Sequence, residues 1–232
     1  MGVAYGSSTI YQATKGIVQD GLVLNLDAGV KESVNGTTWH DLSDNQYNAT
    51  IANGPIYNKE KGGKIICDGT NDFVYIDDTL NMSYVTASVV WTKDSAAGSS
   101  DHIVFNKENA WEIRDLSNNI SWAVKANNKQ WFWHDVGYDL VIGQPLQVDL
   151  TYDGDYVKTY INGSLYNTYT YPTGGILHQS TSYPKLNSRD ATKTTWASGA
   201  NHTYYKFLVY NRALTATEIT QNYNVTRHRF GI

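Results

Sequence analysis

The sequence predicts an all-β protein, an antiparallel β-sandwich with one short C-terminal helix. Composition is the first reason, because 18 Tyr, 7 Trp and 19 Gly among 232 residues favour strands and turns. The second is that apolar and polar residues alternate along several short runs, as in strands with one buried face. The third is that Asp-Gly and Asn-Gly pairs separate such runs, as they do in hairpins. A chain of this length is expected to form one domain with a sizeable core.

The clearest strands lie in residues 146–171, LQVDLTYDGDYVKTYINGSLYNTYTY. Its first seven residues place apolar side chains at every second position, which predicts a strand with one face toward a core. Asp153 and Gly154 then supply turn residues, and Asn162 and Gly163 give the strongest short hairpin signal. The stretch therefore predicts an antiparallel meander of three strands, with one face for the core and one for water.

Shorter runs predict the remaining strands. They comprise residues 21–29, 87–92 and 207–210, and four strands around 102–105, 110–114, 120–124 and 130–134 that Asn-rich turns connect. In the last of these four, Trp131 and Trp133 alternate with Phe132 and His134. One pair is therefore expected to point into the sandwich and the other pair outward.

One helix is predicted from residue 216 to near residue 224. Thr215 is placed as its N-cap, and Glu218 follows three residues later, which is the spacing of a capping box. Leu214 and Ile219 fit the hydrophobic staple that often accompanies such a box. A helix of about two turns is marginal by itself, so Ile219 and Tyr223 are expected to pin it to a sheet.

Composition also limits the classes of partner and compartment. A net charge of −4 gives no electrostatic case for nucleic acid or an anionic membrane. No apolar run approaches the ~18 residues of a membrane span, so no membrane insertion is expected. Residues 1–20 lack the basic and apolar regions of a signal peptide, which predicts synthesis in the cytoplasm. Cys67, the one cysteine, is expected to be a small core residue.

Several motifs, in order along the chain, resemble those of laminin-G-like, concanavalin A-like lectin/glucanase domains. Residues 146–171 are similar to the family signature of a strand, a DG turn and a strand ending in NG, although the family's leading Trp-His-His is absent. TTWHDLSDNQYNAT at 37–50 and CDGTNDFV at 67–74 are similar to two further family motifs, with Cys67 in place of the usual Phe. The resemblance implies a concanavalin A-like jelly roll.

The two ends of the chain are similar to laminin-G-like proteins of tailed bacteriophage virions. QDGLVLNLDAG at 19–29 resembles the start of those proteins, and NRAL at 211–214 with QNYNVTRHRFGI at 221–232 resembles their end. We therefore expect an N-terminal arm at 1–19, a laminin-G-like domain at 20–225 and a C-terminal tail at 226–232. The resemblance implies a virion structural protein, displayed on the capsid or tail of a phage as a decoration or adhesion module.

A lectin that recognises a host surface glycan is the alternative function. In the first case the partners are other virion proteins and the location is the virion surface, after synthesis in the host cytoplasm. In the second case a host glycan is the partner. Sequence does not separate these two hypotheses.

Glycoside hydrolysis is disfavoured, and we expect no enzyme. Glucanases of this fold carry two carboxylates on one strand face in an E-x-D-x-x-E pattern, and this chain has no such triplet. Glu112 and Asp115 are the nearest match, but a spacing of three residues puts them on opposite faces of a strand. A cysteine nucleophile requires a histidine partner, and no sequence pattern pairs Cys67 with a histidine.

The sequence predicts no cofactor, and bound calcium is the alternative hypothesis. Asp68, Asn71 and Asp72 on one turn, or Asp153 and Asp155 on another, offer the oxygen ligands that calcium prefers. The same residue types are also the usual turn formers, so the alternative is that they only shape these turns.

Glycan binding would rest on aromatic side chains, because a flat ring packs against the apolar face of a pyranose. The candidates are Trp111, Trp131, Trp133 and His134, in the part of the chain that least resembles the family. The alternative is that these large aromatics fill the core.

Docking to a particle would rest on the chain ends. Arg227 and Arg229 are candidates for contact with acidic partners, and Phe230 is a candidate apolar anchor. The alternative is that chain ends this short are simply frayed.

Overall fold

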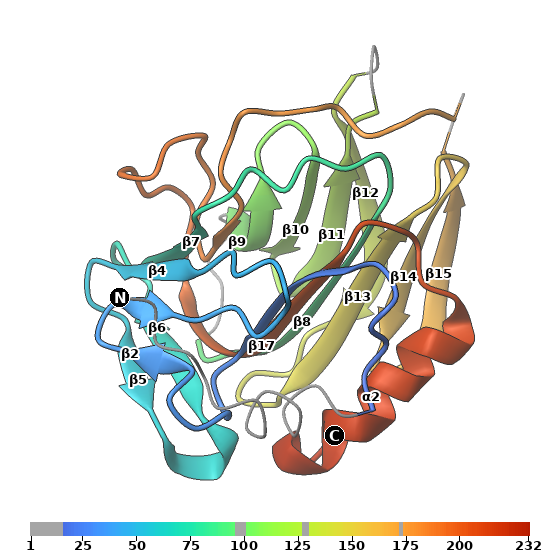
Figure 1. The fold of residues 1–232 in the computed structure, drawn as a ribbon. Coiled ribbons are helices and arrows are strands. Elements are labelled where there is room, and N and C mark those ends of the chain that lie inside the picture. Colours follow the sequence, from blue (N-terminus) through green and yellow to red (C-terminus); the bar gives the residue numbers. More distant parts are fainter. Residues whose placement is uncertain (1–15, 96–100, 127–129, 172–173) are drawn as a thin grey trace.

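The computed structural model describes residues 16–95, 101–126, 130–171 and 174–232. They form two antiparallel sheets packed face to face, with the helix α2 (Ala216–Phe230) against the outside of one sheet (Figure 1). The predicted fold class, an antiparallel β-sandwich with one C-terminal helix, is confirmed. None of the described helices is long and apolar enough to cross a membrane.

The sheet that carries the helix, sheet A, contains the predicted meander. Its strand order is β15, β14, β13, β8, β17, β6 and β5, and β1 also pairs with β17. The strands are β1 (Leu22–Asp27), β5 (Ile56–Asn58), β6 (Lys64–Asp68), β8 (Val85–Lys93), β13 (Leu146–Tyr152), β14 (Tyr156–Ile161), β15 (Ser164–Thr170) and β17 (Asn201–Tyr210). Asn162 and Gly163 have φ of 47° and 77°, the positive values that a two-residue hairpin turn of type I′ needs.

The opposite sheet, sheet B, contains the four predicted strands of the central region. Its order is β12, β11, β10, β9, β16, β7, β4, β3 and β2. The strands are β2 (Val34–Asn35), β3 (Thr38–Trp39), β4 (Ala49–Ala52), β7 (Phe73–Ile76), β9 (Asp101–Lys107), β10 (Trp111–Leu116), β11 (Asn119–Val124), β12 (Phe132–Asp139) and β16 (Lys185–Leu186), and a short 3-10 helix, η1 (Glu60–Gly62), precedes β6.

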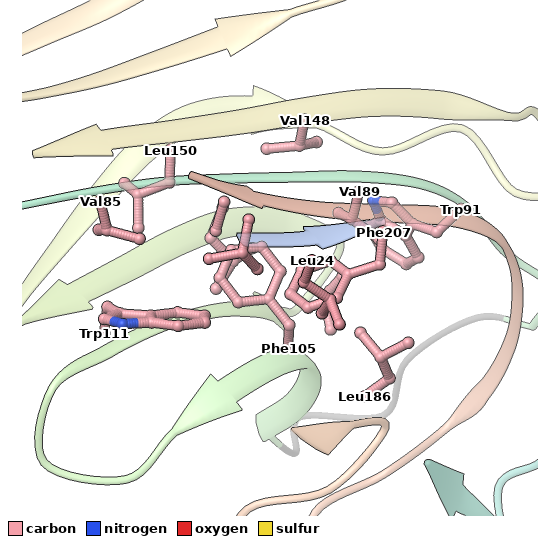
Figure 2. Packing of buried hydrophobic residues seen from close by; sticks show 14 of the residues in the cluster. Leu24, Val85, Val89, Trp91, Phe105, Trp111, Val148, Leu150, Leu186 and Phe207 are labelled. Atoms are coloured by element: carbon pink, nitrogen blue, oxygen red, sulfur yellow. The ribbon is translucent and has the colours of Figure 1, made fainter. Parts of the chain in front are cut away.

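The core lies between the inner faces of the two sheets. Figure 2 shows Trp111 and Phe105 of sheet B pointing toward Val85 and Leu150 of sheet A. The rings of Phe105 and Trp111 meet edge to face, with centroids 5.5 Å apart, a favoured aromatic geometry. Cys67 is buried in the same cluster, as predicted.

The helix begins where the sequence predicts but ends later. Thr215 is the N-cap, and the capping box with Glu218 is complete. The predicted end near residue 224 is wrong, since α2 continues to Phe230, where Gly231 caps it with φ of 73°. The last turns are held by tertiary contacts, which helix propensity does not reveal: the ring of Phe230 packs on Tyr205 with centroids 5.2 Å apart.

Residues 16–19 pack beneath this helix, and the rest of the predicted N-terminal arm lies outside the described residues. Ile17 and Val18 are buried with Tyr210 in a second apolar cluster on the outer face of sheet A. The backbone N–H of Val18 donates to Asn222 Oδ1 at 2.8 Å, and Asn222 Nδ2 donates to the Tyr210 hydroxyl at 2.9 Å. This part of the arm therefore belongs to the domain.

Asp149 on β13 is a buried carboxyl on the same outer face. Gln147 Nε2 donates to both of its oxygens at 3.1 Å, and Ser88 also hydrogen-bonds to it. Burial raises the pKa of Asp149 from 3.8 to about 6. Because the folded-state pKa is the higher one, this group's contribution to stability is complete below pH 3.8 and is lost as the pH rises through about 6.

Asp149→Asn removes that charge while keeping the shape of the side chain. We expect the variant to be more stable than the wild type at pH 7, by about 1 kcal/mol or more, and to lose this advantage by pH 4. Thermal unfolding of both proteins across this range measures the difference. Asp44→Asn, at an exposed carboxylate, is the matched control and should show no such trend; a constant difference for Asp149→Asn would contradict the account.

Candidate functional site

The register of sheet B places one continuous row of residues on its outer face. Cross-strand partners share a face, and Trp111 and Ile113 point into the core, so Glu112 between them points outward. Following the pairs from strand to strand gives the row Trp133, Ala123, Glu112, Asn106, Lys185, Tyr75 and Thr50. Two aromatic rings therefore flank a polar centre.

The segment 187–199 covers the centre of this row. Arg189 binds Glu112 with two nitrogens, of which Nε lies 3.2 Å from Oε2, and Lys185 Nζ donates to the Thr195 carbonyl at 2.6 Å. Asn187 Nδ2 fixes the start of the segment by donating to the Asp72 carbonyl at 2.9 Å. Glu112 and Lys185 are completely buried as a result.

The end of the row at Trp133 stays half-exposed. The guanidinium of Arg114 lies 3.6 Å from the centroid of the Trp133 ring, and that of Arg189 lies 5.4 Å from it. Trp131 meets Trp133 edge to face, with centroids 5.8 Å apart. Asp101 contacts both cations, since its oxygens lie 2.7 Å from Arg114 Nη1 and 3.5 Å from Arg189 Nη1. We call these five residues the Trp131–Trp133 surface.

The chemistry of this surface suits an uncharged polar ligand with an apolar face. The indole rings offer flat apolar area, and no described cation stacks on Trp131. The two guanidinium groups offer planar sets of N–H donors. Since Asp101 and Glu112 balance Arg114 and Arg189, the surface carries little net charge.

Two of the four sequence candidates for glycan binding lie on this surface. Trp131 and Trp133 point outward, whereas Phe132 and His134 point into the sandwich, so the predicted alternation is confirmed. His134 packs against Tyr169 with ring centroids 4.6 Å apart, and burial lowers its pKa. Trp111 is completely buried in the core, which is the alternative that the sequence left open for it.

The two carboxylates nearest to a hydrolase pattern lie on opposite faces, as the sequence predicts. Glu112 faces outward beneath Arg189, and Asp115 faces inward against Lys93. Burial raises the pKa of Glu112 to about 7, but Arg189 and Asn106 occupy its oxygens and its side chain has no exposed area. A substrate cannot reach this carboxyl, so the pair offers no acid and nucleophile for glycoside cleavage.

The calcium candidates act as turn residues. Asp68 Oδ1 accepts from the backbone of Thr70 at 2.8 Å, and Asp72 Oδ2 accepts from the backbone of Asp68 at 3.0 Å. Asp153 Oδ1 accepts from the backbone of Asp155 at 3.0 Å. The described residues contain no group of three His, Cys, Asp or Glu side chains that could hold a metal, and a role for Asn71 remains a prediction.

Two of the three candidates for particle docking, Arg229 and Phe230, hold the end of α2. Arg229 Nη1 and Nη2 each lie 2.7 Å from an oxygen of Asp27, which is buried, and Phe230 packs on Tyr205. Burial acts to raise the pKa of Asp27, but the Arg229 guanidinium holds it below its ordinary value. Arg227 is exposed, with its guanidinium 5.7 Å from the Tyr223 ring.

A cavity is formed by a different part of the chain from the Trp131–Trp133 surface. It is a cavity of about 550 Å³ between the turn at residues 28–35 and the segment 57–63, with Lys31, Tyr57 and Lys59 on its wall. The Tyr57 hydroxyl donates to the Ala28 carbonyl at 3.0 Å, which joins the two sides. No local sequence pattern predicts this cavity, because two segments that are separated in the chain form it.

Sequence reasoning also missed the polar half of the Trp131–Trp133 surface. Arg114 comes from β10, Asp101 from β9 and Arg189 from the segment after β16. Only the strand register and the path of segment 187–199 bring them to Trp133. A cross-strand register derived from paired strand patterns could have placed Arg114, but nothing local marks Arg189.

Comparison with known proteins agrees with this architecture. A model of the concanavalin A-like lectin/glucanases superfamily matches residues 68–220, which is more than half of the chain. A search of the curated proteins finds no match. Among solved structures, the botulinum neurotoxin serotype D binding domain is similar with a TM-score of 0.68 and 14% identity, over 90% of this chain and 52% of that chain.

Two further binding domains have the same fold. That of Paraclostridial Mosquitocidal Protein 1 has a TM-score of 0.68 and 16% identity, over 89% of this chain and 52% of that chain. That of botulinum neurotoxin DC, solved in complex with rat synaptotagmin II, has a TM-score of 0.67 and 16% identity, over 90% and 52%. The chain thus spans about half the length of these structures. At such identities the likeness concerns the fold alone.

The different roles of the two C-terminal arginines can be tested by substitution. Arg229→Ala leaves the buried Asp27 carboxylate without its closest partner and should lower the free energy of unfolding by about 3 kcal/mol. Arg227→Ala, at an exposed position, should change it by less than about 0.5 kcal/mol. Urea unfolding followed by circular dichroism measures both values, and equal effects would contradict the assignment.

Proposed function

The chain belongs to the concanavalin A-like lectin/glucanases superfamily, and on that premise we propose that it is a non-catalytic binding module that holds a surface glycan on the Trp131–Trp133 surface. The half-exposed pair of indole rings, framed by Arg114 and Arg189, is the observation that carries the proposal. A pyranose would pack its apolar face on an indole ring, and its hydroxyls would accept hydrogen bonds from the guanidinium groups.

The fixed geometry of the surface supports this role. Glu112 holds Arg189 with two contacts, and Asp101 binds Arg114, so the donors are positioned before a ligand arrives. Such preorganisation reduces the entropy lost on binding. The structurally similar toxin domains are named as binding domains, and one was solved with synaptotagmin II, which agrees with a role in recognition for this fold. A binding screen that includes both proteins and glycans would distinguish a protein receptor from a glycan ligand.

We propose the surface of a tailed phage particle as the place where the module works. Support comes from the resemblance of residues 19–29 and 221–232 to laminin-G-like phage proteins. In this setting the module is a decoration or adhesion protein of the capsid or tail, and other virion proteins are its second class of partner. Because Arg229 and Phe230 anchor α2, the exposed Arg227 is the remaining docking candidate among the three.

Glycan binding is tested by substitution of the indole rings. On a glycan array, Trp131→Ala and Trp133→Ala should each weaken binding at least about tenfold, a loss of ~1.4 kcal/mol, because each removes flat apolar contact area. Tyr156→Ala removes an exposed aromatic ring on sheet A and is the control, with no expected effect on binding. Thermal unfolding should show that all three variants remain folded. Binding that survives both tryptophan substitutions would contradict the assignment.

The virion role is tested with particles of the encoding phage that lack the protein. The full chain should co-sediment with them at a fixed stoichiometry, and Trp133→Ala should co-sediment equally well, because docking and glycan recognition use different surfaces. Glycan binding without any co-sedimentation would support the lectin hypothesis and contradict the virion role.

A further inference from the structure

A lysine and an aspartate meet inside the sandwich, away from the Trp131–Trp133 surface. Lys93 is the last residue of β8 in sheet A, and Asp115 lies on β10 in sheet B. Lys93 Nζ contacts Asp115 Oδ2 directly, and the two side chains are only 1% and 0% exposed. The contact therefore crosses the core from one sheet to the other.

As an ion pair this contact is poorly satisfied. An ammonium has three N–H donors, but Lys93 Nζ has one hydrogen-bond partner among the described residues. Asp115 Oδ1 is buried and has no partner. Burying two charges costs several kcal/mol per ion unless further hydrogen bonds offset it. Transfer of one proton from nitrogen to oxygen cancels both charges and leaves an amine beside a carboxylic acid.

A proton carrier lies next to the pair. His102 is the cross-strand partner of Asp115 on β9, and its Nδ1 is 3.9 Å from Asp115 Oδ2 without a hydrogen-bond partner of its own. His202 lies beyond it, with ring centroids 6.5 Å apart, and burial lowers the pKa of His202 to about 3. The surroundings thus disfavour charge and hold imidazole nitrogens that are free to exchange a proton.

We propose that Lys93 and Asp115 join in an intramolecular isopeptide bond. The lone pair of the neutral Lys93 Nζ attacks Asp115 Cγ, and the Cγ–Oδ2 bond breaks. The leaving oxygen keeps its own proton and receives the second from Nζ by way of His102, so that one water molecule departs. A cavity of about 10 Å³, close to the smallest that holds one water molecule, is lined by Lys93, Trp91 and Leu146. The product is an uncharged amide, which removes the cost of the buried ions.

The bond would tie the two sheets together covalently. β8 lies beside β13 and β17 in sheet A, while β10 lies between β9 and β11 in sheet B. A cross-link between them restricts the unfolded chain as a disulfide does, without depending on the redox compartment. The bond does not require a ligand, so its presence or absence can be established independently of the glycan-binding role.

Mass spectrometry of the purified full chain tests the bond. Under denaturing conditions the wild-type chain should have a mass lower by one water molecule than its sequence requires. A protease digest should yield one branched peptide that joins the segments containing Lys93 and Asp115. A full sequence mass together with two separate linear peptides would overturn the proposal.

Three variants distinguish this bond from other losses of water. Lys93→Arg has no amine nucleophile and should show the full mass of its sequence. Asp115→Asn would release ammonia and give the same cross-linked mass as the wild type, because the two products are identical. His102→Gln should form the bond more slowly, as followed by intact mass in samples taken at successive times after synthesis of each chain. A loss of water that persists in Lys93→Arg would assign the loss to another site and overturn the proposal.

Discussion

The alternation of side chains along the strands of sheet B is the constraint on which the rest of the structure depends. It directs Trp111 and Ile113 into the core and Glu112 outward, and it does the same on β12 with His134 and Trp133. A slip of one residue would bury Glu112 among apolar side chains, so the register is strongly specified. The same strand register therefore determines both the core face of sheet B and its outer face, where the proposed binding surface lies.

The motifs that resemble phage proteins at the two chain ends have a structural explanation. Asp27 from the first motif and Arg229 from the last form a bidentate pair, and a Cβ on Gly29 would lie 1.8 Å from Arg229 Nη2. Asp41, in a third motif, accepts from the backbone of Asn25 at 2.8 Å and so fixes the neighbouring strand. Asp27 and Arg229 hold the C-terminal helix to the sandwich, so the resemblance at these positions has a structural role in the fold.

Local signals predicted the longer strands, both hairpin turns of the meander and the start of α2, because alternation, turn residues and caps act within a few residues. They did not predict the strands of two to four residues, namely β2, β3, β4, β5, β7 and β16. They did not predict the end of α2, which depends on contacts of Arg229 and Phe230 with distant strands. For the site, alternation predicted that Trp133 and His134 lie on opposite faces of the strand. It did not predict which of the two faces outward. The guanidinium groups of Arg114 and Arg189 reach Trp133 only through tertiary structure.

The seven tryptophans allow the central claim to be tested in one experiment. Fluorotryptophan can be incorporated and its fluorine NMR spectrum recorded while a glycan found on the array is added, with Trp→Phe variants to assign the signals. The account predicts that the signals of Trp131 and Trp133 move together with increasing glycan. The signals of the buried tryptophans stay in place, namely those of Trp39, Trp91, Trp111 and Trp122. Saturable binding that leaves the signals of Trp131 and Trp133 unmoved would contradict the account.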